Sequence, residues 1–172
     1  MRFSMVLAPA ALIAVAPAAA ANPADAAINA MYESIAAGVA ANSGEGVVAA
    51  FADEAVVLDA RPGPPAEGAA FRAGIQKMAE RLKADGVQVK ADYRVTRRIV
   101  SGDIAVDTGF RRQTMAVAKP DGPQPGTQYH KFLVVAQRQP DGRWKIVRDA
   151  SLPASKEAWD AAARVDGLKY DG

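Results

Sequence analysis

The sequence of 172 residues contains no cysteine and a single histidine, His130. Without cysteine the chain can form no disulfide, has no thiol nucleophile and offers no thiolate to a metal. One histidine is too few for the histidine-rich sites that often hold zinc. We therefore expect neither a metal nor a cofactor, and a domain that is stable without cross-links.

An excess of charge of either sign is also lacking. The chain has 21 basic and 19 acidic residues, and without residues 1–21, which contain only Arg2 among these, it has 20 and 19. Domains that bind nucleic acid or anionic membranes concentrate positive charge, and the arginines here come without a ladder of aromatic residues. The balance argues against both kinds of partner.

Long apolar runs are missing except at the N-terminus. Arg2 is followed by the apolar stretch Met5–Val15 and by "APAAAA", whose small residues suit cleavage after Ala21. We interpret residues 1–21 as a secretory signal peptide, with a retained N-terminal anchor as the alternative. The protein is then expected to be periplasmic or secreted, with no integral membrane segment after cleavage.

The 151 residues after Ala21 suffice for one domain with a sizeable core. Helical spacing predicts a helix at Asp25–Ala41 with Tyr32 on its buried stripe, and Ser43 can cap a short second helix. A short strand follows at Ala55–Asp59, and the proline-rich "RPGPP" after it is a loop. Apolar residues recurring at helical spacing predict a third helix, closed by Gly86: Phe71, Ile75, Met78 and Leu82.

After Gly86 the apolar period changes from helical to two. "VQVKADYRVT" predicts a long half-buried strand, in which Arg97 falls on the apolar parity, so either a bulge lies there or an arginine points inward. A second strand has Ile104, Val106, Thr108 and Phe110 on one face. "YHKFLVVAQRQ" is apolar on both faces and is predicted to be central, and "RWKIVRDASL" closes the sheet. We expect Phe51, Phe71, Ile75, Phe132 and Trp144 to join helices and sheet in the core.

These elements predict an α+β fold in which three N-terminal helices cover a curved antiparallel sheet and leave a cone-shaped cavity. The domain is expected at residues 22–153, followed by an extension at 154–172 with a short helix around Trp159. Loose packing, a lid and a partner contact are all open for this extension.

Three segments of the chain form a recognisable set: "GEGVVAAFADEAVVLD", "EGAAFRAGIQKM" and "QRQPDGRWKIVRDASLP". In their order and spacing they resemble the nuclear transport factor 2-like superfamily, which includes ketosteroid isomerases and SnoaL-like polyketide cyclases. The resemblance implies a conical ligand cavity, a homodimer formed through the outer face of the sheet, and a general base at Asp59, where such isomerases end a strand with aspartate. It also implies a tyrosine on the first helix that donates a hydrogen bond to an oxyanion, and Tyr32 is on the right face of that helix but about one turn too early in the sequence. Val134 stands near the place where the family has its second acid.

The residues themselves leave these roles open. Asp59 is a pocket acid with a raised pKa, or it only holds the "RPG" turn or pairs with Arg61. Tyr32 can serve the core alone, His130 shares a face with Phe132 and Val134, and Asp107 can face either the pocket or solvent. The candidate catalytic residues are Asp59, Tyr32 and His130. The candidate ligand-binding residues are Tyr32, Asp59, Phe71, Ile75, Tyr93, Asp107 and His130.

The leading functional hypothesis is an exported domain that binds a small apolar or amphipathic molecule in its cone. One alternative is a cofactor-independent isomerase, cyclase or hydrolase that uses Asp59 as general base. Another is a structural or interaction domain whose cavity is filled by side chains.

Overall fold

The computed structural model of the chain describes residues 22–60, 62–117 and 125–171, so the predicted signal peptide, residues 1–21, lies outside the described residues. The helices are α1 (Asp25–Ala40), α2 (Gly44–Val48), α3 (Gly68–Ala84) and α4 (Lys156–Asp160). The strands are β1 (Phe51–Leu58), β2 (Ala66–Glu67), β3 (Val87–Ser101), β4 (Ile104–Val117), β5 (Gly126–Arg138) and β6 (Trp144–Pro153).

The N-terminal helices form where the sequence predicts them. α1 buries the apolar stripe that includes Ile28, Tyr32 and Ile35. The Ser43 side chain caps α2 by accepting a hydrogen bond from the Gly46 N–H at 3.0 Å. Gly86 follows α3 with a φ of 67°, a left-handed conformation that glycine adopts without a steric penalty.

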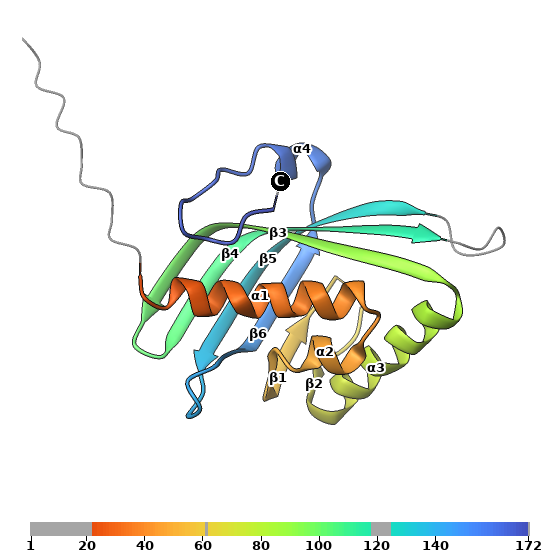
Figure 1. The fold of residues 1–172 in the computed structure, drawn as a ribbon, viewed down its shortest axis with the longest axis horizontal. Helices are drawn as coiled ribbons and strands as arrows, with labels where there is room; N and C mark the ends of the chain where they lie inside the picture. Colours follow the sequence, from red (N-terminus) through yellow and green to blue (C-terminus); the bar gives the residue numbers. More distant parts are fainter. Residues whose placement is uncertain (1–21, 61, 118–124, 172) are drawn as a thin grey trace, which may run out of the picture.

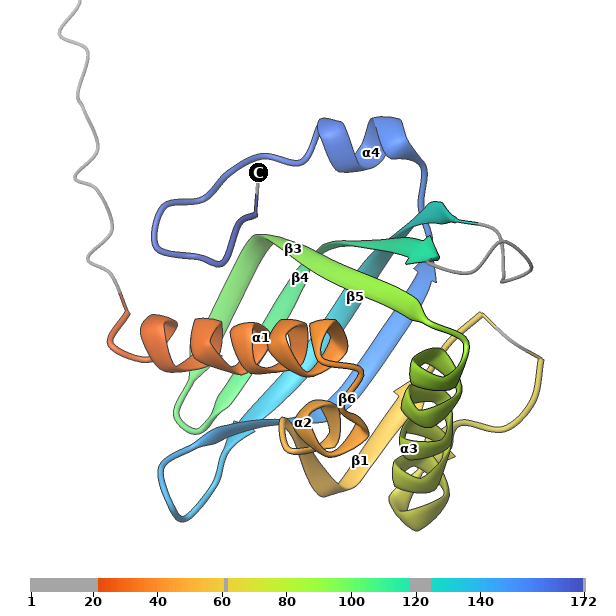
Figure 2. The same ribbon diagram turned by 45° about the vertical axis from the view of Figure 1, so that its right-hand side comes forward.

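The strands form one curved sheet in the order β2-β1-β6-β5-β4-β3, and α1, α2 and α3 lie against its concave face (Figures 1 and 2). β3 to β6 form the predicted antiparallel meander, with β5 in its interior. β1, however, pairs with β6 in parallel, so the sheet is mixed rather than wholly antiparallel. Parallel pairing needs a long crossover, and the chain supplies one because α3 and the strands β3 to β5 lie between β1 and β6.

A β-bulge in β3 decides which arginine faces the helices. Val95 pairs with Gly109 and Arg97 with Thr108, so Thr96 is the extra residue. The bulge reverses the alternation of faces. Arg97 is therefore exposed, whereas the side chain of Arg98 is 3 % exposed on the concave side.

The face of β4 that carries Ile104, Val106 and Phe110 is the outer face of the sheet, away from the helices. Ile104 is 38 % exposed, whereas Ala105 and Asp107, on the opposite face, are buried. On β5, Leu133 is 43 % exposed and Phe132 is buried. The concave face of β4 is therefore its less apolar face.

The core lies between the helices and the concave face. Phe51, Phe71, Phe132 and Trp144 are buried in it, as predicted. Ile75 is partly buried against the same cluster.

The C-terminal segment follows the free edge of β3 (Figure 2). The Val95 N–H donates to the Lys169 carbonyl at 2.9 Å, and the Asp171 N–H donates to the Tyr93 carbonyl at 2.9 Å. Trp159 of α4 is buried, and the Arg94 guanidinium lies 4.2 Å from the centre of its ring. The segment thus covers an edge that would otherwise expose unpaired backbone groups.

None of the helices in the described part of the chain is both long enough and apolar enough to cross a membrane.

Candidate functional site

A row of polar side chains crosses the middle of the concave face. Tyr93, Arg111 and His130 are direct cross-strand partners on β3, β4 and β5. Cross-strand partners share a face of the sheet. Their face is the concave one, because Phe132, two residues after His130, packs its ring 5.9 Å from that of Tyr32 on α1.

Within the described part of the chain, two buried nitrogen atoms of this row lack hydrogen-bond partners. The Arg111 Nε and the His130 Nδ1 are buried and have no hydrogen-bond partner within the part of the chain that the structure describes. Burial lowers the pKa of His130, and the positive charge of Arg111 lowers it further. His130 is therefore held neutral beside a permanent cation.

Asp149 and Ser151 of β6 lie beside this row on the same face. Asp149 pairs with Val134 and Ser151 with Phe132, both of which point into the core. The Ser151 hydroxyl donates to the Asp149 carboxyl at 3.3 Å. Burial raises the pKa of Asp149; Arg111 and Ser151 oppose this, and the charge of Asp59 adds to it. We call Tyr93, Arg111, His130, Asp149 and Ser151 the concave polar cluster.

The phenol of Tyr93 completes the cluster. Its ring is buried 5.0 Å from that of Tyr32 and 6.1 Å from that of Phe132. Burial raises the pKa of Tyr93, and the Arg111 guanidinium opposes that shift. Tyr93 is therefore a neutral hydrogen-bonding group near Arg111.

A separate buried network occupies the sheet beneath the start of α1. The Tyr32 hydroxyl donates to Asp107 Oδ2 at 3.0 Å. Arg98 donates to both Asp107 oxygens at 2.8 Å and to Asp25 Oδ1 at 3.2 Å. Burial and the Asp107 carboxylate raise the pKa of Tyr32 well above its usual value. Tyr32 and Asp107 thus already have protein partners, as a buried ion pair requires.

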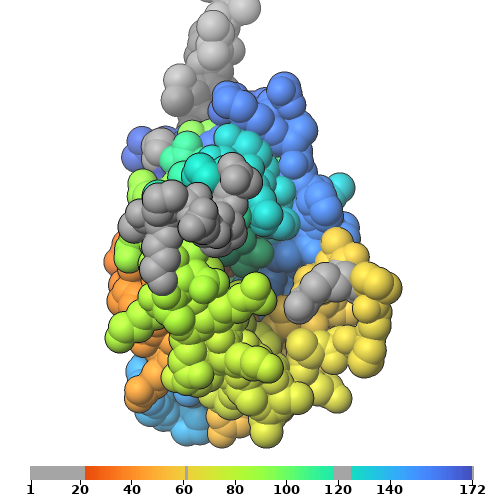
Figure 3. Space-filling view, turned by 90° about the vertical axis from the view of Figure 1, so that its right-hand side faces the viewer, coloured from red at the N-terminus to blue at the C-terminus, as the bar shows by residue number. Residues whose placement is uncertain are grey.

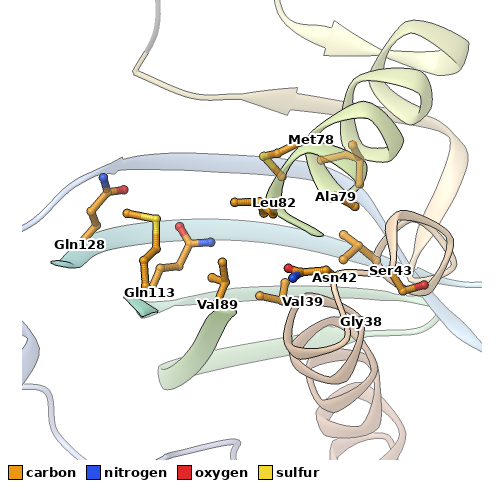
Figure 4. Close-up of a pocket in the computed structure, with 13 residues that line it drawn as sticks. Gly38, Val39, Asn42, Ser43, Met78, Ala79, Leu82, Val89, Gln113 and Gln128 are labelled. Atoms are coloured by element: carbon orange, nitrogen blue, oxygen red, sulfur yellow. The ribbon is translucent and has the colours of Figure 1, made fainter. Parts of the chain in front are cut away.

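A cavity of about 210 Å³ opens between α3, the end of α1 and the strands β3 to β5. In Figure 3, which views this end of the molecule, α3 (yellow-green) lies below the ends of β4 and β5 (teal). Figure 4 shows Met78, Ala79 and Leu82 on one side of the cavity and Val89 and Gln113 on the other. The lining residues are Gly38, Val39, Asn42, Ser43, Val47, Ile75, Met78, Ala79, Leu82, Val89, Gln113, Met115 and Gln128.

The cavity wall is apolar with a few uncharged polar groups. Asn42 Nδ2 donates to the Val87 carbonyl at 2.7 Å, whereas Asn42 Oδ1 is buried without a partner among the described residues. Gln113 and Gln128, which are cross-strand partners, add two amides. The wall therefore suits an uncharged, mainly apolar group with a hydrogen-bond donor.

The structure separates the predicted ligand-binding residues into several environments. Ile75 lines the cavity, and Phe71 packs on Phe51 with ring centres 5.0 Å apart. Asp59 is exposed just after β1 and lies near enough to Asp149 to affect its pKa. The remaining four belong to the concave polar cluster (Tyr93, His130) or to the buried network (Tyr32, Asp107). Their catalytic or binding roles stay predictions.

Sequence reasoning missed Asp149, and it placed Arg111 on a strand without deciding whether its side chain points inward. Arg111 and Asp107 are an even number of residues apart on β4, so their side chains lie on the same face of the sheet. Knowing the face of Asp107 would therefore have given the face of Arg111. Asp149 has the opposite parity to the buried residues Trp144 and Ile146, but a bulge at Val147 places it inward. No sequence signal announces that bulge.

The described residues contain no group of three or more histidine or acidic side chains placed to hold a metal ion.

No protein-family model and no curated protein sequence matches the chain. Solved structures do match it. A putative scytalone dehydratase from Novosphingobium aromaticivorans has a TM-score of 0.63 and 20% identity over 76% of this chain and 83% of that chain. A ketosteroid isomerase-like protein from Erwinia carotovora atroseptica has a TM-score of 0.61 and 18% identity, covering 78% and 98%.

A third similar structure is described by its fold. It is a nuclear transport factor 2-like protein with a cystatin-like fold from Novosphingobium aromaticivorans, with a TM-score of 0.61 and 19% identity over 81% of this chain and 88% of that one. At these identities the likeness concerns the fold. The element order, the curved sheet and these matches agree with the resemblance seen in the sequence: the chain has the nuclear transport factor 2-like fold.

Proposed function

We propose that the protein is an exported domain that binds a small apolar or amphipathic molecule on the concave side of its sheet. The observation that carries this proposal is the cavity of about 210 Å³ between α3 and the strands. Its volume lies below the roughly 300–1,000 Å³ of pockets for drug-sized ligands, so the ligand is small. An open cavity also favours binding over a purely structural role with a filled cone.

The cavity adjoins the concave polar cluster. Gln113 in its wall is two residues from Arg111 on the same face of β4, a separation of roughly 7 Å along a strand. A molecule with an apolar body and a polar end can therefore reach both. This arrangement favours an amphipathic ligand over a purely apolar one.

Filling the cavity tests the proposal. Ala79 is buried in the cavity wall, and Ala73 is exposed on the same helix. Ala79→Leu should weaken binding of neutral probes, 1-octanol and 2-naphthalenemethanol, by about tenfold, because the added carbons take ligand space. Ala73→Leu should leave binding unchanged, and both variants should keep the wild-type circular dichroism spectrum. Absence of probe binding to the wild type, or equal effects of both substitutions, would contradict the proposal.

A second candidate function is proton transfer without a cofactor, with Asp59 as general base. It is favoured by Asp149, a buried carboxyl with a raised pKa that the charge of Asp59 helps to raise. Neighbouring acids whose environments separate their pKa values can act as an acid and base pair. The acid would be Asp149 and the base the exposed Asp59.

Deuterium exchange tests this second function. If Asp59 is the base, the protein should catalyse exchange of the methyl protons of 2-acetonaphthone in D₂O, followed by NMR. Asp59→Asn should lower that rate on the order of a hundredfold while leaving the melting temperature unchanged. Glu54→Gln, which changes another exposed acid on β1, is the control. An unchanged rate in Asp59→Asn would assign Asp59 no part in catalysis.

Export is tested on the protein from its native cell. The signal at residues 1–21 predicts a mature N-terminus at or within a few residues of Asn22. Mass spectrometry of the periplasmic or secreted fraction should find this terminus. An uncleaved chain in the cytosol would contradict export.

A further inference from the structure

Two arginines point to the concave side, and their surroundings differ sharply. Arg98 is held by Asp107 and Asp25 through hydrogen bonds of 2.8 to 3.2 Å. Arg111 has a buried Nε without a hydrogen-bond partner, and the ion pairs among the described residues do not include it. A buried donor without a partner is costly, so the unsatisfied Nε–H of Arg111 calls for an explanation.

The neighbouring groups satisfy Arg111 only in part: Tyr93 lies within hydrogen-bonding reach of its guanidinium, whereas Nε meets no partner among the described residues. Asp149 is near enough for Arg111 to influence its pKa, but burial outweighs this attraction and the pKa of Asp149 is raised. His130 lies directly across from Arg111, with its Nδ1 buried and also without a partner among the described residues. Side chains in such a pair start about 5 Å apart, so one small group can contact both.

We infer that Arg111 and His130 form a subsite for a carboxylate, and that the ligand of the proposed function is a small apolar carboxylic acid. A guanidinium fork matches a carboxylate bidentately, which would satisfy the unpaired Nε–H of Arg111. His130 can donate to the same group through Nδ1 once that nitrogen carries the proton. The apolar body of the acid then lies in the cavity beyond Gln113. The placement of the apolar body in the cavity rests on the proposed function, whereas the carboxylate subsite at Arg111 and His130 does not depend on it.

Acetate tests the subsite without the cavity, because acetate has almost no apolar body. Arg111 Nε–H and the His130 ring are observed by NMR in the whole mature chain. Acetate should shift both signals in a saturable manner, whereas acetamide at the same concentrations should not. Arg111→Met should abolish the saturable shift at His130. The matched control is Arg97→Met, which removes an exposed arginine from the opposite face of the same sheet.

Matched acid and alcohol probes then test the ligand class. Octanoate should bind at least about tenfold more tightly than 1-octanol, as expected for a hydrogen bond to a charged group. Arg111→Met should remove the preference for octanoate without weakening the binding of 1-octanol. Arg111→Lys should keep part of the preference, and Arg97→Met should keep all of it. Circular dichroism checks that each variant is folded.

The outcomes separate this inference from the proposed function. If octanol binds in the cavity but octanoate has no advantage, or keeps its advantage in Arg111→Met, the carboxylate subsite is overturned and the binding function stands. If acetate binds at Arg111 while octanol and octanoate do not use the cavity, the subsite stands and the proposed function falls. If acetate causes no saturable shift at either residue, the subsite is overturned.

Discussion

Asp107 and Asp149 show how two buried carboxyls in one row of the sheet come to differ. Both pair with Val134 across β5, so they share the concave face. Asp107 accepts hydrogen bonds from Tyr32 and Arg98, whereas Asp149 accepts a long hydrogen bond of 3.3 Å from Ser151. The first is a structural ion pair, and the second is a carboxyl whose ionisation burial opposes.

The raised pKa of Asp149 gives a prediction with a defined sign. Its folded-state pKa lies above the value of about 3.9 expected when unfolded, so the folded state loses stability as the pH rises from about 4 through the folded-state pKa. Asp149→Asn should therefore stabilise the protein at neutral pH by on the order of 1 kcal/mol and have little effect below pH ~4. Urea unfolding from about pH 4 to neutral pH measures the change in the free energy of unfolding, with Glu54→Gln as the control at an exposed acid. Destabilisation at neutral pH would show that ionised Asp149 is instead stabilised by Arg111.

Trp144 provides a second prediction for a single residue. Its side chain is 7 % exposed and belongs to the core between helices and sheet. Trp144→Ala should lower the free energy of unfolding by ~3 kcal/mol or more, because it leaves a large cavity. Denaturant unfolding measures this value. A loss under ~1 kcal/mol would be incompatible with a tightly enclosed ring.

Among the elements, the C-terminal segment and β3 stabilise one another. Arg94 donates to the Trp159 carbonyl at 2.6 Å and lies 4.8 Å from the centre of the Tyr170 ring. The same segment holds the backbone of Tyr93, a member of the concave polar cluster, through Asp171. It therefore connects α4 to the strand that carries one end of the candidate site.

Removing the Trp159 ring tests this connection. Trp159→Ala should destabilise the protein by about 3 kcal/mol and speed hydrogen exchange at the Tyr93 and Val95 amides. Exchange at Val134, within the centre of the sheet, should rise less. Asp166→Ala, an exposed change in the same segment, is the control. Unchanged exchange at Tyr93 and Val95 would mean that the segment does not depend on Trp159 to stay on β3.

At the scale of the whole molecule, the outer face of the sheet exposes an apolar surface. Several large apolar side chains on it are more than a third exposed: Leu58, Ile99, Ile104, Leu133 and Leu152. Leu58 and Leu133 both pair with Ala150, so they share this face with it. Apolar patches of this kind mark interaction surfaces. We propose that this face forms the homodimer interface that the sequence resemblance implies.

A charge in the middle of this face tests the dimer. Leu133→Glu should shift the protein from dimer to monomer in analytical ultracentrifugation, because an interface would bury the new carboxylate. Its melting temperature at high dilution should change little, since Leu133 is exposed in the monomer. Met78→Glu, which changes an apolar residue on α3 that is also exposed, should leave the dimer intact. A wild-type protein that sediments as a monomer would contradict the proposal.

The sequence by itself determined the helices, the four long strands and the α+β class, but not β2, the start of β1 at Phe51 or its parallel pairing with β6. The helical spacing of Ile28, Tyr32 and Ile35, the cap at Ser43 and the period of two after Gly86 are local patterns, and each corresponds to an element of the structure. Local patterns predict local structure because the backbone period places every third or fourth, or every second, side chain on one face. The central position of β5 followed from the same argument.

The composition of the candidate site was decided only by the tertiary structure. The bulges at Thr96 and Val147 reverse the faces of the residues after them, which turns Arg98 and Asp149 inward. Tyr32 and Asp107 are 75 residues apart in the chain, so no local pattern could reveal their hydrogen bond. Arg111 is distinguished from Arg98 by its buried Nε, which meets no partner among the described residues. Register and pairing depend on contacts between distant strands, and those contacts exist only in the folded chain.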